Sequence, residues 1–321
     1  TKAGAQTITG STFYNLTVSG SGVKTMSGTS SIYNNLTINT GATLTAPTSS
    51  VLTIASGYAG AVTINGTGVF DDGGGAHFFS GATWTAGTSS YSGTGSMTFN
   101  RNNTVTLAGG SFNNLYFTGS NNITVSAAVA VTGDVNVALT GGNTITFNSN
   151  VSITGNGTGV FSLAAAHTMN INGANNCPSG FSAYTLDATS TTNYTQAFDQ
   201  TIGGITYGHL TLNNATIKTL AGNITVLGNL SISTATLDVS SNNYSITVGG
   251  NYNNNNTGSL KSNGTTHAGE LILNGAGAQN IDNGTAGSGS KSIYKLTIAK
   301  TIGSTATVAN TNLTVLNNLT V

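Results

Sequence analysis

Carboxylate side chains are the groups that could perform hydrolysis or hold a metal in this sequence, and the chain has eight of them. Glycosidases need two carboxylates on either side of the bond they break, and Ca²⁺ needs several oxygen ligands close together. Asp71 and Asp72 are adjacent and precede three glycines and His77, a grouping that fits either a cation site or an exposed turn. We favour the turn, because the sequence has neither the spaced ligands of an EF-hand nor the nonapeptide repeat of Ca²⁺-binding β-rolls.

The four histidines and the single cysteine form no recognisable constellation. His77, His167, His209 and His267 are far apart in the sequence, so they do not make a metal-ligand motif. Cys177 has no second thiol for a disulfide or a zinc site, and we expect it to be a buried structural residue. No nucleophile elbow, H-E-x-x-H or phosphate-binding loop occurs. The sequence therefore predicts a protein that is not an enzyme, with no catalytic residue, no cofactor and no metal.

Cations and aromatic residues leave one binding alternative. The eight Lys and Arg residues are mostly isolated, whereas nucleic acids and anionic membranes bind clustered cations, so we expect no nucleic-acid partner. No apolar run approaches the roughly 20 residues that cross a bilayer, which predicts no membrane insertion. Aromatic residues near Trp84, near Tyr91 and over 181–194 are the candidates for an exposed glycan-binding surface.

The composition predicts an ordered, almost entirely β protein. Charged residues make up 5% of the chain, against roughly 25% in ordinary soluble domains. Zero formal charge, two prolines and regularly spaced Val, Ile and Leu argue against disorder. Helix formers are scarce, whereas Thr, Val, Ile, Tyr and Phe suit a pleated sheet. This composition is more typical of secreted proteins than of cytosolic enzymes, so we expect an extracellular or cell-surface location.

A short apolar motif returns along the whole chain. An aromatic or aliphatic residue is followed three and five positions later by apolar residues, usually with Thr between the last two, which is the alternation of a strand. We expect the apolar positions of the motif to be buried. The positions that mark it are Phe13, Leu16, Val18, Phe112, Leu115, Tyr207, Leu210 and Leu296.

The spacing of these copies predicts an all-β parallel solenoid, or β-helix. Leu16 and Leu36 are 20 residues apart, and short strand-like segments continue at similar intervals, which suits coils of about 16–20 residues. The anchor leucines Leu16, Leu115, Leu210 and Leu296 are 99, 95 and 86 residues apart, so a longer module spans several coils. Tandem β-sandwich modules of about 95 residues are the alternative, although sandwich strands usually run longer.

We expect residues 1–321 to form one continuous solenoid array, because each unit of a repeat protein packs only on its neighbours. The strand pattern loosens near 71–96 and near 164–200, which predicts irregular excursions there.

Neither end of the sequence has the pattern of a solenoid cap. At one end, Leu313, Val315, Leu319 and Val321 continue the apolar alternation. An uncapped coil exposes unpaired backbone groups and an apolar core. We therefore expect either a fragment of a longer array or ends that stack head to tail between subunits.

Segments such as 13–18, 228–232 and 246–252 are similar to the repetitive passenger regions of bacterial surface proteins of the filamentous-haemagglutinin and autotransporter type. The resemblance implies a parallel β-helix, export, and a structural or adhesive role. It brings no catalytic residues, because the matching positions are apolar or turn residues.

The combined expectation is a structural extracellular protein, a subunit of a filament, sheath or surface stalk whose main partner is another copy of itself. The alternative is a cell-surface adhesin that binds glycans through exposed aromatic residues.

Overall fold

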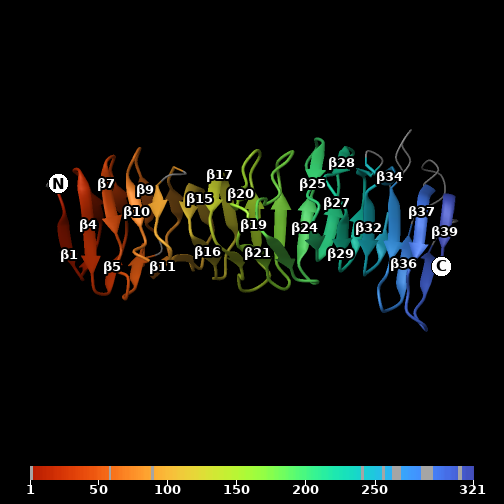
Figure 1. The fold of residues 1–321 in the computed structure, drawn as a ribbon, viewed down its shortest axis with the longest axis horizontal. Helices are drawn as coiled ribbons and strands as arrows, with labels where there is room; N and C mark the ends of the chain where they lie inside the picture. Colours follow the sequence, from red (N-terminus) through yellow and green to blue (C-terminus); the bar gives the residue numbers. More distant parts are fainter. Residues whose placement is uncertain are drawn as a thin grey trace. The chain divides into compact units, whose positions relative to one another are not determined.

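The computed structural model describes residues 3–57, 59–87, 90–239, 242–254, 257–261, 269–282, 292–309 and 313–321. β-strands are the only regular secondary structure in this described part, so it holds no helix that could cross a membrane. The strands stack in parallel and form a β-solenoid of about 13 turns (Figure 1). The predicted fold class is confirmed, and the tandem β-sandwich is wrong, because sandwich sheets are antiparallel.

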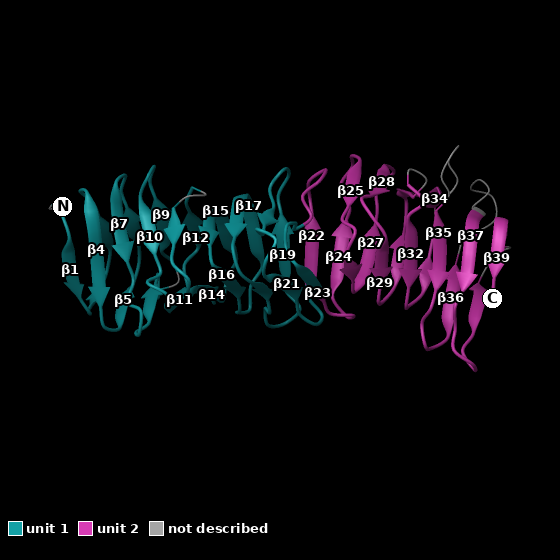
Figure 2. Ribbon diagram, viewed as in Figure 1, with its two compact units in different colours: residues 1–167, 178–185 teal, residues 168–177, 186–321 magenta. Residues whose placement is uncertain are grey.

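The chain divides into two compact units (Figure 2). Unit 1 consists of residues 1–167 and 178–185, and unit 2 of residues 168–177 and 186–321. The chain passes from one unit to the other within 164–200, where the sequence pattern loosens.

Three parallel sheets make up unit 1. The first contains β1 (Gln6–Thr9), β4 (Gly22–Ser27), β7 (Ala42–Thr45), β10 (Val69–Asp71) and β13 (Tyr91–Ser92). The second contains β2 (Thr12–Phe13), β5 (Ser30–Ile32), β8 (Leu52–Ile54), β11 (Ala76–Phe79), β14 (Ser96–Phe99), β16 (Asn114–Phe117), β18 (Val135–Val137), β21 (Val160–Leu163) and β23 (Ala183–Leu186). The third contains β3 (Leu16–Val18), β6 (Leu36–Ile38), β9 (Ala61–Ile64), β12 (Thr83–Thr85), β15 (Val105–Phe112), β17 (Ile123–Val131) and β19 (Thr144–Phe147), with β20 (Ile153–Thr154) beside β17.

Unit 2 also has three sets of parallel strands. One contains β25 (Gln200–Ile202), β28 (Ile217–Leu220), β31 (Thr236–Asp238) and β34 (Ser259–Lys261). Another contains β26 (Thr206–Tyr207), β29 (Ile224–Val226), β32 (Ser245–Val248), β35 (Glu270–Leu273), β37 (Ser292–Ile298) and β39 (Thr314–Thr320). The last contains β22 (Thr168–Ile171), β24 (Thr191–Tyr194), β27 (His209–Leu212), β30 (Leu230–Ile232), β33 (Tyr252–Asn253), β36 (Gln279–Asp282) and β38 (Ala306–Ala309).

The coils are longer and more variable than predicted. Paired residues on neighbouring coils are from 18 positions apart, as in Gln6 and Lys24, to 29 positions apart, as in Tyr252 and Ile281. The turns between strands take up the extra residues at the surface. The strand register stays fixed, because a slip of one residue would turn the buried side chains outward.

In the described part of 71–96, the strands continue the regular coil in place of the irregular excursion expected there. Strands β10 to β14 run through this segment, and each pairs in parallel with the corresponding strand of a neighbouring coil. The apolar pattern loosens here because the core is filled by a few large aromatic side chains. Trp84, fully buried, meets the rings of Phe70, Phe79, Phe99 and Phe112 at centroid distances of 5.5–5.9 Å. In the second segment, residues 172–182 lie between strands β22 and β23.

Asparagine side chains connect one coil to the next at the turns. In unit 1, Asn15 Oδ1 accepts the backbone N–H of Asn35, and Asn35 Oδ1 accepts that of Ala61. In unit 2, Asn229 Oδ1 accepts the N–H of Asn251 at 2.8 Å. These bonds satisfy backbone groups that would otherwise lie unpaired at strand starts. They give the high asparagine content a structural cause.

Candidate functional site

The recurring apolar motif forms the solenoid core. Leu115, Tyr207 and Leu210 have no exposed surface, and Val18, Phe112 and Leu296 are also buried. Phe13 and Leu16 belong to the first coil and are half-buried. The motif therefore packs coil on coil and offers no side chain for chemistry.

The adjacent aspartates have structural partners. The Asp72 carboxylate is fully buried and accepts hydrogen bonds from the N–H of Gly74 at 2.7 Å, the N–H of Gly95 at 2.9 Å and the hydroxyl of Tyr91 at 2.9 Å. Burial and the Asp72 charge raise the pKa of Tyr91 well above its usual range. Asp71 accepts the N–H of Gly73. The pair thus forms a turn tied to the next coil, although Asp72 is enclosed where an exposed turn was expected.

Three histidines lie in separate structural environments. His77 is buried, its Nδ1 accepts the N–H of Leu52 at 3.1 Å and its Nε2–H donates to the Asp72 carbonyl at 2.8 Å, so the ring is neutral. Burial lowers the pKa values of His77 and His167. His209 takes the place of an asparagine cap, because its Nδ1 accepts the N–H of Asn229. His267 lies outside the described residues. Within them, no three of His, Cys, Asp and Glu lie close enough together to hold a metal ion.

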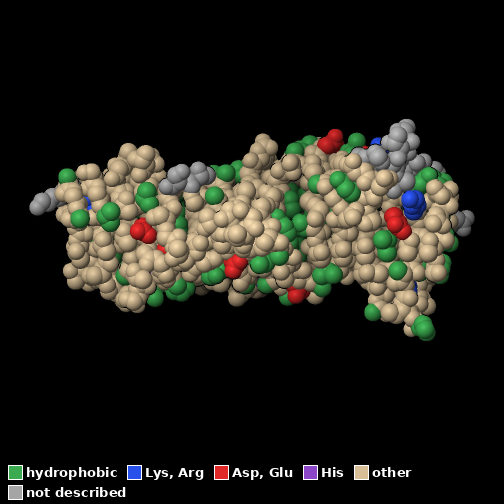
Figure 3. Space-filling model, viewed as in Figure 1, with side chains coloured by type: hydrophobic (Ala, Val, Ile, Leu, Met, Phe, Trp, Pro, Cys, Tyr) green, Lys and Arg blue, Asp and Glu red, His purple; other side chains and the backbone are tan. Residues whose placement is uncertain are grey.

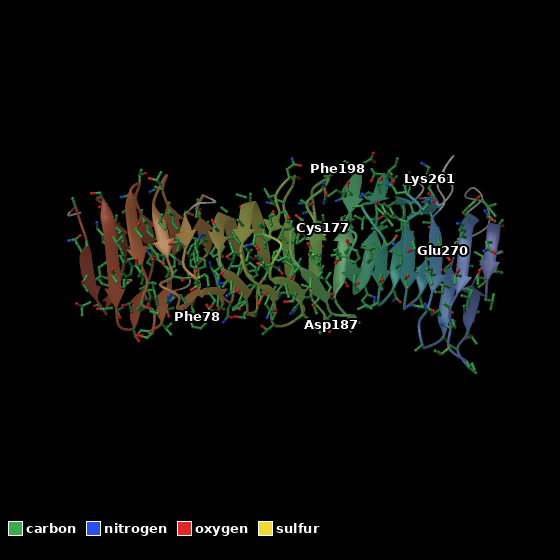
Figure 4. All side chains as sticks on the ribbon, in the orientation of Figure 1. Phe78, Cys177, Asp187, Phe198, Lys261 and Glu270 are labelled. Atoms are coloured by element: carbon green, nitrogen blue, oxygen red, sulfur yellow. The ribbon has the colours of Figure 1, made fainter. Side chains whose placement is uncertain are left out.

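Cys177, labelled in Figure 4, is half-buried in unit 2. Its thiol interacts with the hydroxyls of two buried tyrosines, Tyr194 and Tyr207. The Tyr194 and Tyr207 hydroxyls are 3.3 Å apart, and the Tyr207 hydroxyl donates to the Gly203 carbonyl at 2.8 Å. Burial raises the pKa of the Cys177 thiol, which disfavours the reactive thiolate. This environment fits a structural cysteine.

The aromatic residues considered for glycan binding are buried, apart from Tyr184 in the segment 181–194, which is half-buried. Trp84 and Tyr194 have no exposed surface, and Tyr91 and Phe181 retain less than a tenth of theirs. They lie inside because a coil this small fills its core with a few large rings. Another pair is exposed: Tyr14 at 66% and Tyr33 at 50%, with stacked rings 5.6 Å apart on neighbouring coils. Most of the face viewed in Figure 3 is uncharged.

Two buried lysines form the least expected feature of the core. Lys218 is fully buried, and its ammonium donates to the carbonyls of Gln196 and Phe198, to Gln200 Oε1 and to Thr216 Oγ1, all within 3.1 Å. Gln200 in turn donates through Nε2 to the carbonyls of the preceding coil. The cage thus joins three successive coils without a carboxylate in contact.

The first coils of unit 1 contain a related cage. Lys24 is buried and donates to the carbonyls of Gly4, Gly20, Ser21 and Gly22, with the Ser21 bond at 2.7 Å.

A third copy lies near the end of unit 2. Lys300 donates to the carbonyls of Gly275 and Gly277 and to Gln279 Oε1 at 2.7–2.8 Å. Gln279 Nε2 reaches back to the carbonyls of Val248 and Gly250, and its Oε1 accepts the N–H of Gly275.

We call these three cages the Gln–Lys clamps. The sequence did not predict them, because its lysines were interpreted as isolated surface charges. Two short sequence patterns could have revealed the clamps. The first is Gln followed two positions later by Ile, and the second, further along the chain, is Lys-Thr followed by an apolar residue. The pairs are Gln6 with Lys24, Gln200 with Lys218 and Gln279 with Lys300, separated by 18, 18 and 21 residues. These pairs accompany three of the four anchor leucines, Leu16, Leu210 and Leu296, and the module of Leu115 has none.

The clamps and tyrosines predict an alkaline optimum of stability. Burial lowers the pKa of Lys218 to about 8, an effect that Asp199 opposes, so between pH 8 and 10.5 the unfolded chain binds more protons and stability rises with pH. Burial raises the pKa values of Cys177, Tyr194 and Tyr207 in the folded chain. The unfolded chain therefore loses these protons first, from about pH 9 for the cysteine and about pH 10 for the tyrosines, and stability falls as the pH rises further.

We therefore expect the free energy of unfolding, measured by urea titration at pH 7 to 11, to be highest between pH 9 and 10. In Lys218→Met the rise from pH 8 to 9 should be at least halved. An unchanged rise in that variant would contradict the assignment to Lys218.

The last coil of unit 2 leaves its core side open. Leu319 is 56% exposed, whereas the residues that occupy the same position on the two preceding coils, Leu296 and Leu271, are 1% and 0% exposed. Val321 is 92% exposed, and Val315 and Leu313 are half-buried. Leu296, Leu319 and Val321 help line an open apolar hollow of about 530 Å³.

Comparison of the chain with protein-family models, with curated proteins and with solved structures gives no match.

Proposed function

We propose that the chain is a structural extracellular protein, a subunit of a filament, sheath or surface stalk in which solenoid ends stack head to tail. The observation that carries the proposal is the open coil of unit 2. Leu319 is exposed at a position that is buried in every preceding coil of its column, from Leu296 through Leu271 to Ile246. A further coil placed there would bury these side chains and pair the free edge of β39.

The polar side chains of the two units support a structural role. They hold neighbouring coils together through the asparagine caps at the turns, the Asp72 turn and the Gln–Lys clamps. Such a ladder resists local unfolding, because each backbone group is paired on both sides. The low charge and the similarity in composition to exported repeat proteins support an extracellular or cell-surface location.

Self-association tests the proposal. The 321-residue chain should form oligomers that grow with concentration in sedimentation velocity and appear as end-to-end particles in electron micrographs. Leu319→Lys should raise the dissociation constant at least tenfold, because a charge would be buried in the contact. Leu227→Lys is the matched control, since Leu227 is 45% exposed in a turn away from the open coil. An equal effect of both variants would contradict end stacking.

The exposed Tyr14–Tyr33 pair favours a second candidate, an adhesin that binds glycans. Two stacked rings beside the Asn15 and Asn34 side chains, which bond each other at 3.1 Å, combine an apolar face with hydrogen-bonding groups. Dispersed monomers that bind a glycan array through Tyr14 would favour this candidate over filament formation.

A further inference from the structure

The second sheet of unit 1 presents a straight row of outward side chains. From β8 to β21 each strand pairs with the next in register, without a bulge. The central residue of each strand points outward, because the residues on both sides of it are buried and side chains alternate between the two faces. In chain order the row consists of Thr53, Phe78, Thr98, Tyr116, Asn136 and Ser162.

Two members of this row are aromatic, whereas the others are small and polar. Phe78, labelled in Figure 4, and Tyr116 are half-buried on the outward side of their strands. A ring in this position stays partly in contact with water, so it gains less from folding than a ring in the core does. Packing of the core therefore does not account for these two side chains. Together they give a neutral sheet face an apolar platform.

The spacing of the two rings favours an extended ligand. Phe78 pairs with Thr98, and Thr98 pairs with Tyr116, so the rings lie two coils apart. Neighbouring strands are about 4.8 Å apart, which makes this separation about 9.6 Å. In an extended β-1,4-linked polysaccharide each sugar is turned over relative to the last, so the same face recurs at every second sugar, at nearly this distance. Tyr33 follows β5, two coils before β11, and adds a third ring at the edge of the sheet.

The polar groups around the rings suit an uncharged ligand. None of the outward positions of β8, β11, β14, β16, β18 and β21 holds a charged residue. The hydroxyls of Thr53, Thr98 and Tyr116 have no hydrogen-bond partner in the described part of the chain. A hydroxyl both donates and accepts, as the hydroxyls of a neutral sugar do, whereas an acidic polysaccharide would need cations.

We infer that this row, the aromatic face, binds a neutral β-1,4-linked polysaccharide that lies across the strands, with Phe78 and Tyr116 packed against alternate sugars. The apolar C–H face of a sugar covers each ring, and the equatorial hydroxyls reach Thr98 and its neighbours. The inference rests on the second candidate function, glycan binding, and names a face and a class of glycan for it. End stacking is independent of it.

Soluble oligosaccharides test the class of ligand. In isothermal titration calorimetry, the 321-residue chain should bind cellohexaose or chitohexaose, which are neutral, extended and β-1,4-linked. Cellobiose is too short to cover both rings and should bind at least tenfold more weakly. Maltohexaose, whose α-1,4 linkages make it curl, should also bind at least tenfold more weakly. Equal binding of maltohexaose, or no binding of either β-linked hexasaccharide, would overturn the inference.

Substitution of the rings tests the place of binding. Phe78→Ala and Tyr116→Ala should each weaken binding of the hexasaccharide at least tenfold, whereas Tyr116→Phe, which keeps the ring, should weaken it less than threefold. Tyr244→Ala is the matched control, because Tyr244 is a half-buried tyrosine in unit 2. It should leave binding within twofold of the parent chain. Circular dichroism checks that each variant is folded.

A second variant blocks the face without removing a ring. Thr98→Arg places a long side chain between the two rings and should also weaken binding at least tenfold, whereas Thr211→Arg, at an outward position of β27 in unit 2, should not. If Tyr14→Ala abolishes binding and Phe78→Ala and Thr98→Arg do not, the ligand lies on the Tyr14–Tyr33 pair and the aromatic face is overturned. Sedimentation velocity of the same samples reports self-association separately, so a failure of either proposal is distinguished from a failure of the other.

Discussion

Replacing Lys218 by methionine should lower the free energy of unfolding of unit 2 by about 2–4 kcal/mol. The ammonium is the shared donor for Gln200 Oε1, Thr216 Oγ1 and the carbonyls of Gln196 and Phe198. Each buried acceptor left without a donor costs about 1–3 kcal/mol. Part of this loss is offset, because methionine packs in the same space and needs no desolvation of a charge.

Lys261→Met is the matched control for this loss. Lys261 has a 54% exposed side chain and forms an ion pair with Asp238 at 2.8 Å. Solvent screens the lysine end of this pair, although the Asp238 side chain is only 10% exposed, so Lys261→Met should cost less than Lys218→Met. Urea titration followed by circular dichroism compares the two variants. A loss below 1 kcal/mol in Lys218→Met would show that the cage relaxes around water and does not hold the coils together.

A double variant distinguishes a clamp from two independent residues. Gln200→Met alone should also destabilise unit 2, because it breaks the bonds to the preceding coil. If Gln200 and Lys218 act through one network, the double variant Gln200→Met/Lys218→Met should lose clearly less stability than the sum of the losses in the two single variants.

Trp84→Ala should destabilise unit 1 by about 3–5 kcal/mol, the range for removing a buried aromatic side chain. Trp84 has no exposed surface and sits among four phenylalanine rings, with Phe79 and Phe112 both at 5.5 Å. A coil this narrow cannot collapse around the cavity, since the strand ladders on all sides fix its width. Hydrogen exchange of the amides in β10 to β15 should rise accordingly.

Tyr14→Ala serves as the control, because Tyr14 is 66% exposed and its ring contact is a single neighbour, Tyr33. It should cost less than about 1 kcal/mol. If Trp84→Ala left stability unchanged, the aromatic cluster would not be the core of these coils.

The fold could be predicted from the alternation of apolar and polar residues along the sequence. Leu16, Leu115, Leu210 and Leu296 repeat because every strand must present alternate residues to the core, and the low content of helix formers leaves only strands to present them. The structure places these leucines in three different sheets, in β3 and β27, in β16 and in β37. The two irregular excursions were predicted where this alternation loosens, and that prediction was wrong for the described part of 71–96. There, aromatic residues such as Phe79 and Trp84 fill the space that several aliphatic residues fill elsewhere, so the count of apolar residues drops without loss of the core.

Less of the candidate site than of the fold could be predicted from the sequence. The open apolar coil at Leu319 and Val321 follows from the uninterrupted strand pattern at that end. The Gln–Lys clamps were missed, because a lysine in a sequence is normally interpreted as a solvated charge. The cages around Lys218 and Lys300 depend on carbonyls of the preceding coil, which are at least 20 residues away in the sequence.

By itself, the sequence determined that this protein is a parallel stack of short strands with neutral, polar faces. The reason is that burial of alternate residues is a local property, and its repetition is visible in the chain. The tertiary structure alone decided which polar groups lie inside. Lys218 and Asp72 are buried because folding brings donors and acceptors from separate coils around them.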